Sequence, residues 1–258
     1  MAMISTAEFF SQLNTAPLPL FRDNKKVYWY NVPASFDIET SSFYQDGIKS
    51  PENKRAIMYI WMFGIGNLVT YGRTWEHFKS FLTVLSTVLG LDENCRLPVY
   101  VHNLPYEWQF IRKHFDWDEV FLLEERKPVR ARFGGIEFRC SLKLSGGKSL
   151  ANVAKDLQSH KIEKKVGDLD YNLIRTPVTY LTEKELGYCE YDIRCVNAYI
   201  EEKIAQDGNV TRIPMTNTGY VREYCRKACF RQMAEIQANY EGIDFGYEGL
   251  RGEDIHGD

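Results

Sequence analysis

Residues 34–39 read Ala-Ser-Phe-Asp-Ile-Glu and join an apolar strand pattern to two carboxylates. Side chains alternate across a β-strand, so we expect Asp37 and Glu39 on one face and Ile38 on the other. Two neighbouring carboxylates on such a strand repel each other and resist burial. A divalent cation offsets that cost, and hard oxygen ligands favour Mg²⁺ or Mn²⁺. Because Asp-x-Glu is a common pattern, a strand edge with two solvated acids is an equally good interpretation of this stretch alone.

Strand and helix patterns on both sides of this stretch predict a mixed α/β fold that begins with an antiparallel meander. Gly66-Asn67 and Gly134-Gly135 are typical of hairpin turns, and Thr182-x-x-Glu185 is typical of a capping box that starts a helix. The other strands are expected at 27–30, 57–65, 68–71, 97–101, 129–133 and 136–140. The helices are expected at 6–13, after Thr74, from Pro105 to Phe115, at 148–158 and at 182–206.

A second acidic position lies in residues 102–107, His-Asn-Leu-Pro-Tyr-Glu, between an apolar strand and a helix. Glu107 falls in the first turn of that helix, where a carboxylate suits the positive end of the helix dipole. The alternative is an ordinary acidic residue at a helix N-terminus, which is frequent.

A third position lies in residues 188–192, Tyr-Cys-Glu-Tyr-Asp, on the predicted helix 182–206. Tyr188 and Asp192 are four residues apart and share a helix face at the border of its apolar stripe. Taken alone they are compatible with an ordinary helix surface. Together the three positions supply the roughly four acidic groups that two metal ions about 3.5–4 Å apart need for phosphodiester hydrolysis.

The patterns D-x-E, N-x-x-Y-E and Y-x-x-x-D resemble the three exonuclease motifs of family B DNA polymerases, the DEDDy group. The resemblance is closer still to the protein-primed polymerases of bacteriophages and linear plasmids, and it runs from about Ser35 to Arg226. It implies an RNase H-like mixed sheet flanked by helices, the 3'-5' exonuclease fold. It further implies hydrolysis at single-stranded DNA 3' ends with two Mg²⁺ or Mn²⁺ ions. The implied roles are metal binding by Asp37, Glu39, Glu107 and Asp192, and assistance to the attacking water by Tyr188.

The resemblance also implies a set of residues that contact the single-stranded DNA end. These are Thr40, Asn103, Tyr106, Ser141, Leu142 and Tyr171. Aromatic side chains are the platforms on which single-stranded bases stack. Since aromatic residues make up 14% of the chain, packing in the core is the standing alternative for either tyrosine.

Two positions depart from the family pattern. The second motif usually ends in aspartate, whereas this chain has Glu107, whose extra methylene we expect a small backbone or rotamer change to absorb. The family carries a catalytic lysine directly before a Gly-Asp-x-Asp-Tyr segment, which here is residues 167–171. Val166 stands at that place, so Lys165 or Lys164 would substitute, and we favour Lys165.

We expect a leader at 1–30, an exonuclease domain at 31–212, and a helical linker with an exposed tail at 213–258. The linker resembles the stretch that joins an exonuclease to a polymerase portion, whose motifs this chain lacks. The chain would then be a cut-down form, one half of a split polymerase or a free-standing exonuclease, with a polymerase portion and a terminal (priming) protein as possible partners. A basic helix is expected there, either to follow DNA phosphates or as a solvated face; its cations are Arg222, Arg226, Lys227 and Arg231.

Several other classes of protein fit poorly. The net charge of −3 is mild evidence against a nucleic-acid binder that works through a global positive field. No stretch approaches the roughly 20 apolar residues of a membrane span, the start does not resemble a signal peptide, and the six cysteines show no zinc-ligand spacing. We therefore expect a cytoplasmic protein, in the host cytoplasm if phage-encoded. Residues 145–149, Ser-Gly-Gly-Lys-Ser, lack the first glycine of a phosphate-binding loop.

Two alternatives to a DNA exonuclease remain open. One is a non-catalytic module that only grips DNA or a priming protein, although a binding site has little use for clustered negative charge. The other is an RNA-directed exonuclease with the same chemistry, because contacts to the 2'-hydroxyl are not readable from sequence.

Overall fold

The computed structural model describes residues 3–15, 17–159, 162, 170 and 173–239, with side chains described as far as residue 235. Lys165 and Tyr171, two of the expected site residues, lie outside the described residues. The chain divides into two compact units, Met1–Asn217 and Thr218–Asp258. In the second unit the described residues belong to one helix, α7 (Asn217–Asn239).

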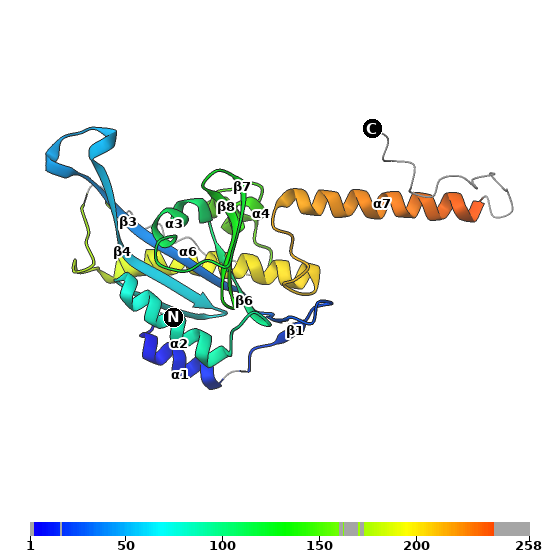
Figure 1. Ribbon diagram of the computed structural model, residues 1–258, viewed down its shortest axis with the longest axis horizontal. Helices are drawn as coiled ribbons and strands as arrows, with labels where there is room; N and C mark the ends of the chain where they lie inside the picture. The colour runs from blue at the N-terminus through cyan, green and yellow to red at the C-terminus, as the bar shows by residue number, and fades with distance from the viewer. Residues whose placement is uncertain (1–2, 16, 160–161, 163–169, 171–172, 240–258) are drawn as a thin grey trace. The chain divides into compact units, whose positions relative to one another are not determined.

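The described part of the first unit forms a mixed sheet whose main path is β5-β4-β3-β6-β9-β8-β7 (Figure 1). Strands β3, β4 and β5 are an antiparallel meander, and β3, β6 and β9 run parallel to one another. The strands are β1 (Leu20–Arg22), β2 (Tyr28–Tyr30), β3 (Ala34–Tyr44), β4 (Lys54–Ile65), β5 (Leu68–Gly72), β6 (Cys95–Val101), β7 (Glu119–Glu124), β8 (Lys127–Phe133) and β9 (Ile136–Cys140). The expected α/β fold, a mixed sheet flanked by helices, is confirmed.

Helices cover both faces of this sheet. The helices are α1 (Thr6–Thr15), α2 (Trp75–Leu89), α3 (Leu104–Ile111), α4 (Ser141–Leu144), α5 (Leu150–Asp156) and α6 (Glu183–Asp207). On the face that α2 covers, the ring of Phe36 from β3 stacks on Phe78 at 4.6 Å between centroids. On the opposite face, Ile60 and Met62 of β4 pack with Ile193 of α6. Phe36 and Ile38 of β3 thus enter the main core, while Ile60 and Met62 of β4 enter a second core against α6.

The first 30 residues contribute to the first unit. Phe9 of α1 is fully buried and lies 5.5 Å from the Phe81 ring of α2, centroid to centroid. Ile4 forms a parallel bridge with Thr70, and β2 pairs in parallel with the start of β6. The residues expected as a leader thus supply part of the core and one edge of the sheet.

The local predictions hold in the core and fail at the edges. Thr74 caps α2 through the backbone N–H of His77, and the turns at Gly66-Asn67 and Gly134-Gly135 join β4 to β5 and β8 to β9. The β3–β4 hairpin is longer than predicted and projects beyond the rest of the sheet, with two 3-10 turns, η1 (Gln45–Gly47) and η2 (Pro51–Asn53), at its tip (Figure 1). Its outer residues are polar and exposed, so they lack the apolar alternation by which strands are recognised.

Candidate metal centre and nucleic-acid interface

The candidate site lies at the carboxyl ends of β6 and β9, beside the middle of β3. β3 pairs with β6 at Ser35 and Tyr100, so Asp37 and Glu39 lie just beyond the carboxyl end of β6. The turn after β6 leads into α3, and Ser141 directly follows β9. Crevices outside the carboxyl ends of parallel strands are where open α/β sheets bind ligands.

Three carboxylates meet at this end of the sheet. Asp37, Glu39 and Asp192 each offer an oxygen, and these oxygens lie within 4.8 Å of one another. Ile38 is buried in the opposite core with 4% of its surface exposed, so the expected alternation along β3 is confirmed. Oxygens on opposite sides of a Mg²⁺ ion lie about 4 Å apart, because each Mg–O distance is about 2.0–2.1 Å. The three side chains are therefore close enough to share a cation after a small adjustment.

Glu107 extends the acidic group from α3. It is buried, with 3% of its surface exposed, and its Oε2 atom has no hydrogen-bond partner among the described residues. Burial raises its pKa to about 8, although a hydrogen bond with Asp37 acts in the opposite direction. A buried carboxylate oxygen without a partner costs free energy, and a metal ion would supply the missing partner.

The electrostatics of the cluster favour a bound cation. Burial raises the pKa of Asp37 well above its ordinary value, and the charges of Glu107, Asp192 and Glu39 raise it further. Burial and the charge of Asp192 raise the pKa of Glu39 to about 8, against an opposing effect of the Arg175 charge. Carboxylates held this close at neutral pH either keep protons or bind a cation. The residues present thus fit one or more divalent ions.

Tyr188 accompanies Asp192 on α6. The two side chains are separated by one helical turn and both are half-buried, on the border between the core of α6 and the crevice. Cys189 and Ile193 on the same helix pack against residues of β4 and β5. Asp192 thereby reaches the carboxylates of β3, while the role of Tyr188 stays a prediction.

Two of the expected DNA-contacting residues touch each other at the rim of the crevice. The Thr40 Oγ1 and Tyr106 Oη atoms lie 2.5 Å apart in a hydrogen bond. A register shift in the β3–β4 pairing between Glu39 and Thr40 changes the direction of the strand here. Tyr106 is 39% exposed and its ring lies 5.5 Å from that of Phe110. An exposed ring with a rigid backing is available for stacking by a base.

The remaining expected contacts differ in exposure. Asn103 is half-buried and holds a left-handed backbone, with φ 82°, in the turn from β6 to α3. Ser141 is fully buried, and its Oγ lies 3.2 Å from Nδ1 of His102. Leu142 is half-buried against the main core. Asn103 and Leu142 thus follow the ends of two different strands, β6 and β9, while the Ser141 hydroxyl is buried beside His102.

Arg175 is the residue near the site that the sequence did not reveal. It is 4% exposed and forms hydrogen bonds with Glu185 at the start of α6. No periodic pattern marks it, because it lies in an irregular segment and its partner is ten residues away. Its partner Glu185 belongs to the capping box that begins at Thr182, seven residues after Arg175.

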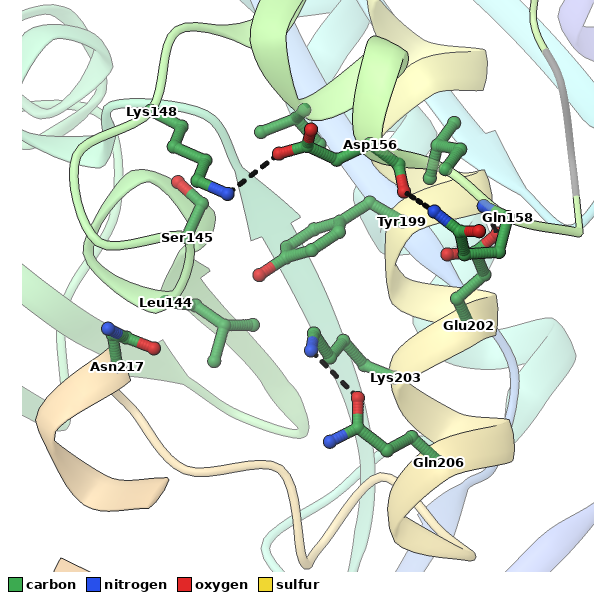
Figure 2. Close-up of a pocket in the computed structure, with 12 residues that line it drawn as sticks. Leu144, Ser145, Lys148, Asp156, Gln158, Tyr199, Glu202, Lys203, Gln206 and Asn217 are labelled. Atoms are coloured by element: carbon green, nitrogen blue, oxygen red, sulfur yellow. Dashed lines mark hydrogen bonds and ion pairs between the residues drawn. The ribbon is translucent and has the colours of Figure 1, made fainter. Parts of the chain in front are cut away.

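A pocket with a volume of about 290 Å³ lies elsewhere, beside α5 and α6 (Figure 2). Tyr199 projects into it from α6, and the Lys148 ammonium pairs with Asp156 at 2.7 Å. None of the four carboxylates of the candidate site lines this pocket. The chemistry therefore concentrates at the strand ends and not in this pocket.

Comparison with known proteins gives a fold-level result. No protein-family model matches the chain, and no curated protein sequence matches it. The structure of Phi29 DNA polymerase complexed with primer-template DNA and incoming nucleotide substrates is similar over 72% of this chain, with a TM-score of 0.54 and 18% identity. The complex with primer-template DNA alone is similar over 78% of this chain, with a TM-score of 0.55 and 15% identity. This chain spans about a third of the length of that polymerase, 32% and 36% in the two cases.

Among the described residues, no helix combines the length and the hydrophobicity that a membrane span requires.

The structural comparison shows that the chain has the α/β fold of one part of Phi29 DNA polymerase. Three clustered carboxylates that could hold a metal ion lie at the strand ends of that fold.

Proposed function

We propose that this chain is a two-metal 3'-5' exonuclease domain that acts on single-stranded DNA ends. The observation that carries the proposal is the meeting of Asp37 and Glu39 from β3 with Asp192 from α6, within 4.8 Å. These residues are far apart in the sequence and lie in two of the motifs named above, and Glu107 from the remaining motif interacts with Asp37. A fold that brings three such motifs together supports a shared chemical task.

Asp37, Glu39, Glu107 and Asp192 would hold two Mg²⁺ or Mn²⁺ ions. Bound there, the ions would activate a water molecule and stabilise the leaving 3'-oxygen. The attack forms a bond from the water oxygen to the terminal phosphorus and breaks the bond to the 3'-oxygen. The products are a 5'-mononucleotide and a strand with a new 3'-hydroxyl. Tyr188 would orient the attacking water through its hydroxyl, with Lys165 as a further catalytic group.

The end of the DNA strand would be held beside the carboxylates by Thr40, Asn103, Tyr106 and Leu142. Tyr106 offers a stacking surface, and the hydroxyl of Thr40 lies beside it. Ser141 and Tyr171 complete the set that the family resemblance implies. The solved complexes of Phi29 DNA polymerase contain primer-template DNA and single-stranded DNA, which supports DNA as the class of substrate. A polymerase portion and a terminal protein are the partners that this proposal implies.

The test is degradation of a 5'-labelled single-stranded DNA oligonucleotide with Mg²⁺ or Mn²⁺. An Asp37→Ala/Glu39→Ala variant and an EDTA reaction serve as controls, and an RNA oligonucleotide of the same sequence runs beside the DNA. We expect a ladder that shortens from the 3' end and is absent in both controls. Binding without degradation under either metal would overturn the proposal in favour of a non-catalytic module. Preferential degradation of RNA would replace it with an RNA-directed exonuclease.

A further inference from the structure

Arg175 lies in the segment before α6, and its side chain reaches two other parts of the chain. Its Nε and Nη2 atoms lie 2.7 and 2.6 Å from Oε1 of Glu185, in the first turn of α6. Its Nη1 atom donates to the backbone carbonyls of Asp170 and Leu173, at 2.9 and 3.2 Å. A guanidinium with 5% of its surface exposed thus has all three of its nitrogens engaged.

The backbone of the same residue is tied to the metal-bearing strand. The Arg175 N–H donates to Oγ of Ser41 at 2.9 Å. Ser41 is two residues beyond Glu39 on β3, so this bond joins the segment directly to the strand that carries two of the carboxylates. The guanidinium carbon also lies 5.8 Å from the centre of the Tyr59 ring on the neighbouring strand β4.

Glu185, the partner of Arg175 on α6, is held in place by further hydrogen bonds. Glu185 closes the capping box, since its Oε2 accepts from the backbone N–H of Thr182 at 2.7 Å and from its hydroxyl at 2.8 Å. Glu185 is one helical turn before Tyr188, and Tyr188 is one turn before Asp192. The start of the helix that carries the proposed water-orienting tyrosine is therefore connected to β3 through Arg175.

We propose that Arg175 is a positioning residue that sets the start of α6 against β3 and thereby orients the helix that carries Tyr188 and Asp192. This inference rests on the proposed function, because it concerns the same hydrolytic site. Arg175 acts through its hydrogen bonds to Glu185 and to backbone carbonyls and through the bond of its backbone N–H to Ser41, and its charge also reaches Glu39. The planar guanidinium suits this role, because Nε and Nη2 converge on one oxygen of Glu185 while Nη1 donates to two carbonyls, an orientation that a lysine ammonium cannot fix.

Arg73 provides a matched control for this proposal. Its side chain also reaches the segment before α6, where Nη2 donates to the carbonyls of Thr176 and Thr179 at 3.0 and 2.7 Å. Its Nε donates to the carbonyl of Tyr59 at 2.6 Å. Among the described residues, Arg73 donates to backbone carbonyls, and none of these hydrogen bonds joins the segment to α6. Loss of Arg73 is therefore expected to loosen the same segment without moving Tyr188.

The kinetic test measures kcat and KM on a 5'-labelled oligonucleotide for Arg175→Met, Arg175→Lys and Arg73→Met. We expect Arg175→Met to lower kcat at least about tenfold while KM changes less than about threefold, because small misplacements of catalytic groups cost large factors in rate. Arg175→Lys is expected to recover part of that loss. Arg73→Met is expected to lower the melting temperature with kcat almost unchanged. In a Tyr188→Phe background the effect of Arg175→Met should shrink, since the two substitutions remove the same contribution.

Hydrogen exchange of backbone amides separates this inference from the proposed function. We expect Arg175→Met to speed exchange in the first turns of α6, and Arg73→Met to speed it only in residues 176–179. Absence of hydrolysis by the wild-type chain would remove the proposed function, while faster exchange in α6 would still support the positioning role. Equal losses of kcat in Arg175→Met and Arg73→Met at equal losses of melting temperature would overturn the inference. Unchanged exchange in α6 of Arg175→Met would also overturn it.

Discussion

Asn103 is held with φ 82° and ψ 50°, in the turn between β6 and α3, where the N–H of Tyr106 donates to its carbonyl at 2.8 Å. Asparagine visits this left-handed region more readily than most residues, and glycine visits it without cost. The Asn103 backbone can therefore form the turn, while its side chain is available to contact the end of a DNA strand. Different substitutions separate these two roles.

We predict that Asn103→Gly retains the stability of the wild type, whereas Asn103→Ala lowers the free energy of unfolding by about 1 kcal/mol because of the left-handed backbone. Both variants should raise KM for single-stranded DNA if the side chain contacts the substrate. Urea denaturation and steady-state kinetics measure the two effects. A wild-type KM in Asn103→Gly would leave the residue with a role in the turn alone.

Tyr106 allows the stacking surface to be separated from the hydroxyl. Tyr106→Phe removes the hydrogen bond with Thr40 and keeps the exposed ring. Tyr106→Ala removes both, and stacking of one base contributes about 1–3 kcal/mol. We predict that KM for the oligonucleotide rises at least about fivefold in Tyr106→Ala, because a loss of about 1 kcal/mol corresponds to about fivefold. In Tyr106→Phe we expect KM to change little. Equal KM values for the two variants would show that the ring does not stack on the substrate.

Within strand β9, Glu137 and Arg139 form an ion pair on the side of the strand opposite the main core. Glu137 is fully buried and accepts a hydrogen bond from Nε of Arg139 at 2.7 Å, and the guanidinium carbon of Arg139 lies 5.2 Å from the centre of the Trp29 ring. Ile136 and Phe138 face the main core on the other side of the strand. The pair thus joins β9 to β2, which lies at the other edge of β6.

We predict that Glu137→Ala lowers the free energy of unfolding by about 3–5 kcal/mol, because it leaves the buried charge of Arg139 without its partner. The double variant Glu137→Leu/Arg139→Met should recover most of that loss. Urea denaturation measures both. A loss below about 1 kcal/mol in Glu137→Ala would mean that water or another carboxylate replaces the partner.

Local sequence patterns predicted those elements whose formation depends on neighbouring residues. The alternation in β3, the cap at Thr74 and the capping box at Thr182 are each properties of a few neighbouring residues, and the structure contains all three. The strands β1 and β7 were not predicted, because short strands gain their stability from pairing with distant segments. α3 ends at Ile111 and not at Phe115, and the Trp117 indole donates instead to the carbonyl of Arg112.

The site was predicted only where motifs lie on regular elements. Asp37, Glu39 and Asp192 meet because a strand and a helix place them, and both elements were readable from the sequence. Arg175 was missed because its contacts with Ser41 and Glu185 arise from an irregular segment that folds back on two elements. Contacts of that kind depend on tertiary packing and leave no periodic signal.

For the molecule as a whole, the cluster links stability to pH and to metal ions. Glu39 and Glu107 have folded-state pKa values of about 8, above their ordinary value of 4.5, mainly because of burial. The folded state therefore keeps protons that the unfolded state has released, and stability without metal falls as pH rises from 4.5 toward 8. A divalent cation takes the place of those protons.

We predict that Mg²⁺ or Mn²⁺ raises the melting temperature of the wild type, and that the rise is larger at pH 8 than at pH 6, where protons compete with the metal. Asp37→Asn/Asp192→Asn should abolish the rise but leave most of the pH dependence in EDTA, because Glu39 and Glu107 remain buried. Differential scanning fluorimetry measures all of these. A metal effect of equal size in the double variant would place the ion outside the cluster.

The most direct test of the whole account is to locate the metal. Crystals of the wild-type chain grown with Mn²⁺ and a 5'-mononucleotide, the expected product, would be measured at the manganese absorption edge. The account predicts anomalous density between Asp37, Glu39 and Asp192, with Glu107 oriented toward it and the nucleotide phosphate beside it. Absence of manganese there, with the carboxylates hydrogen-bonded to one another in protonated form, would contradict it.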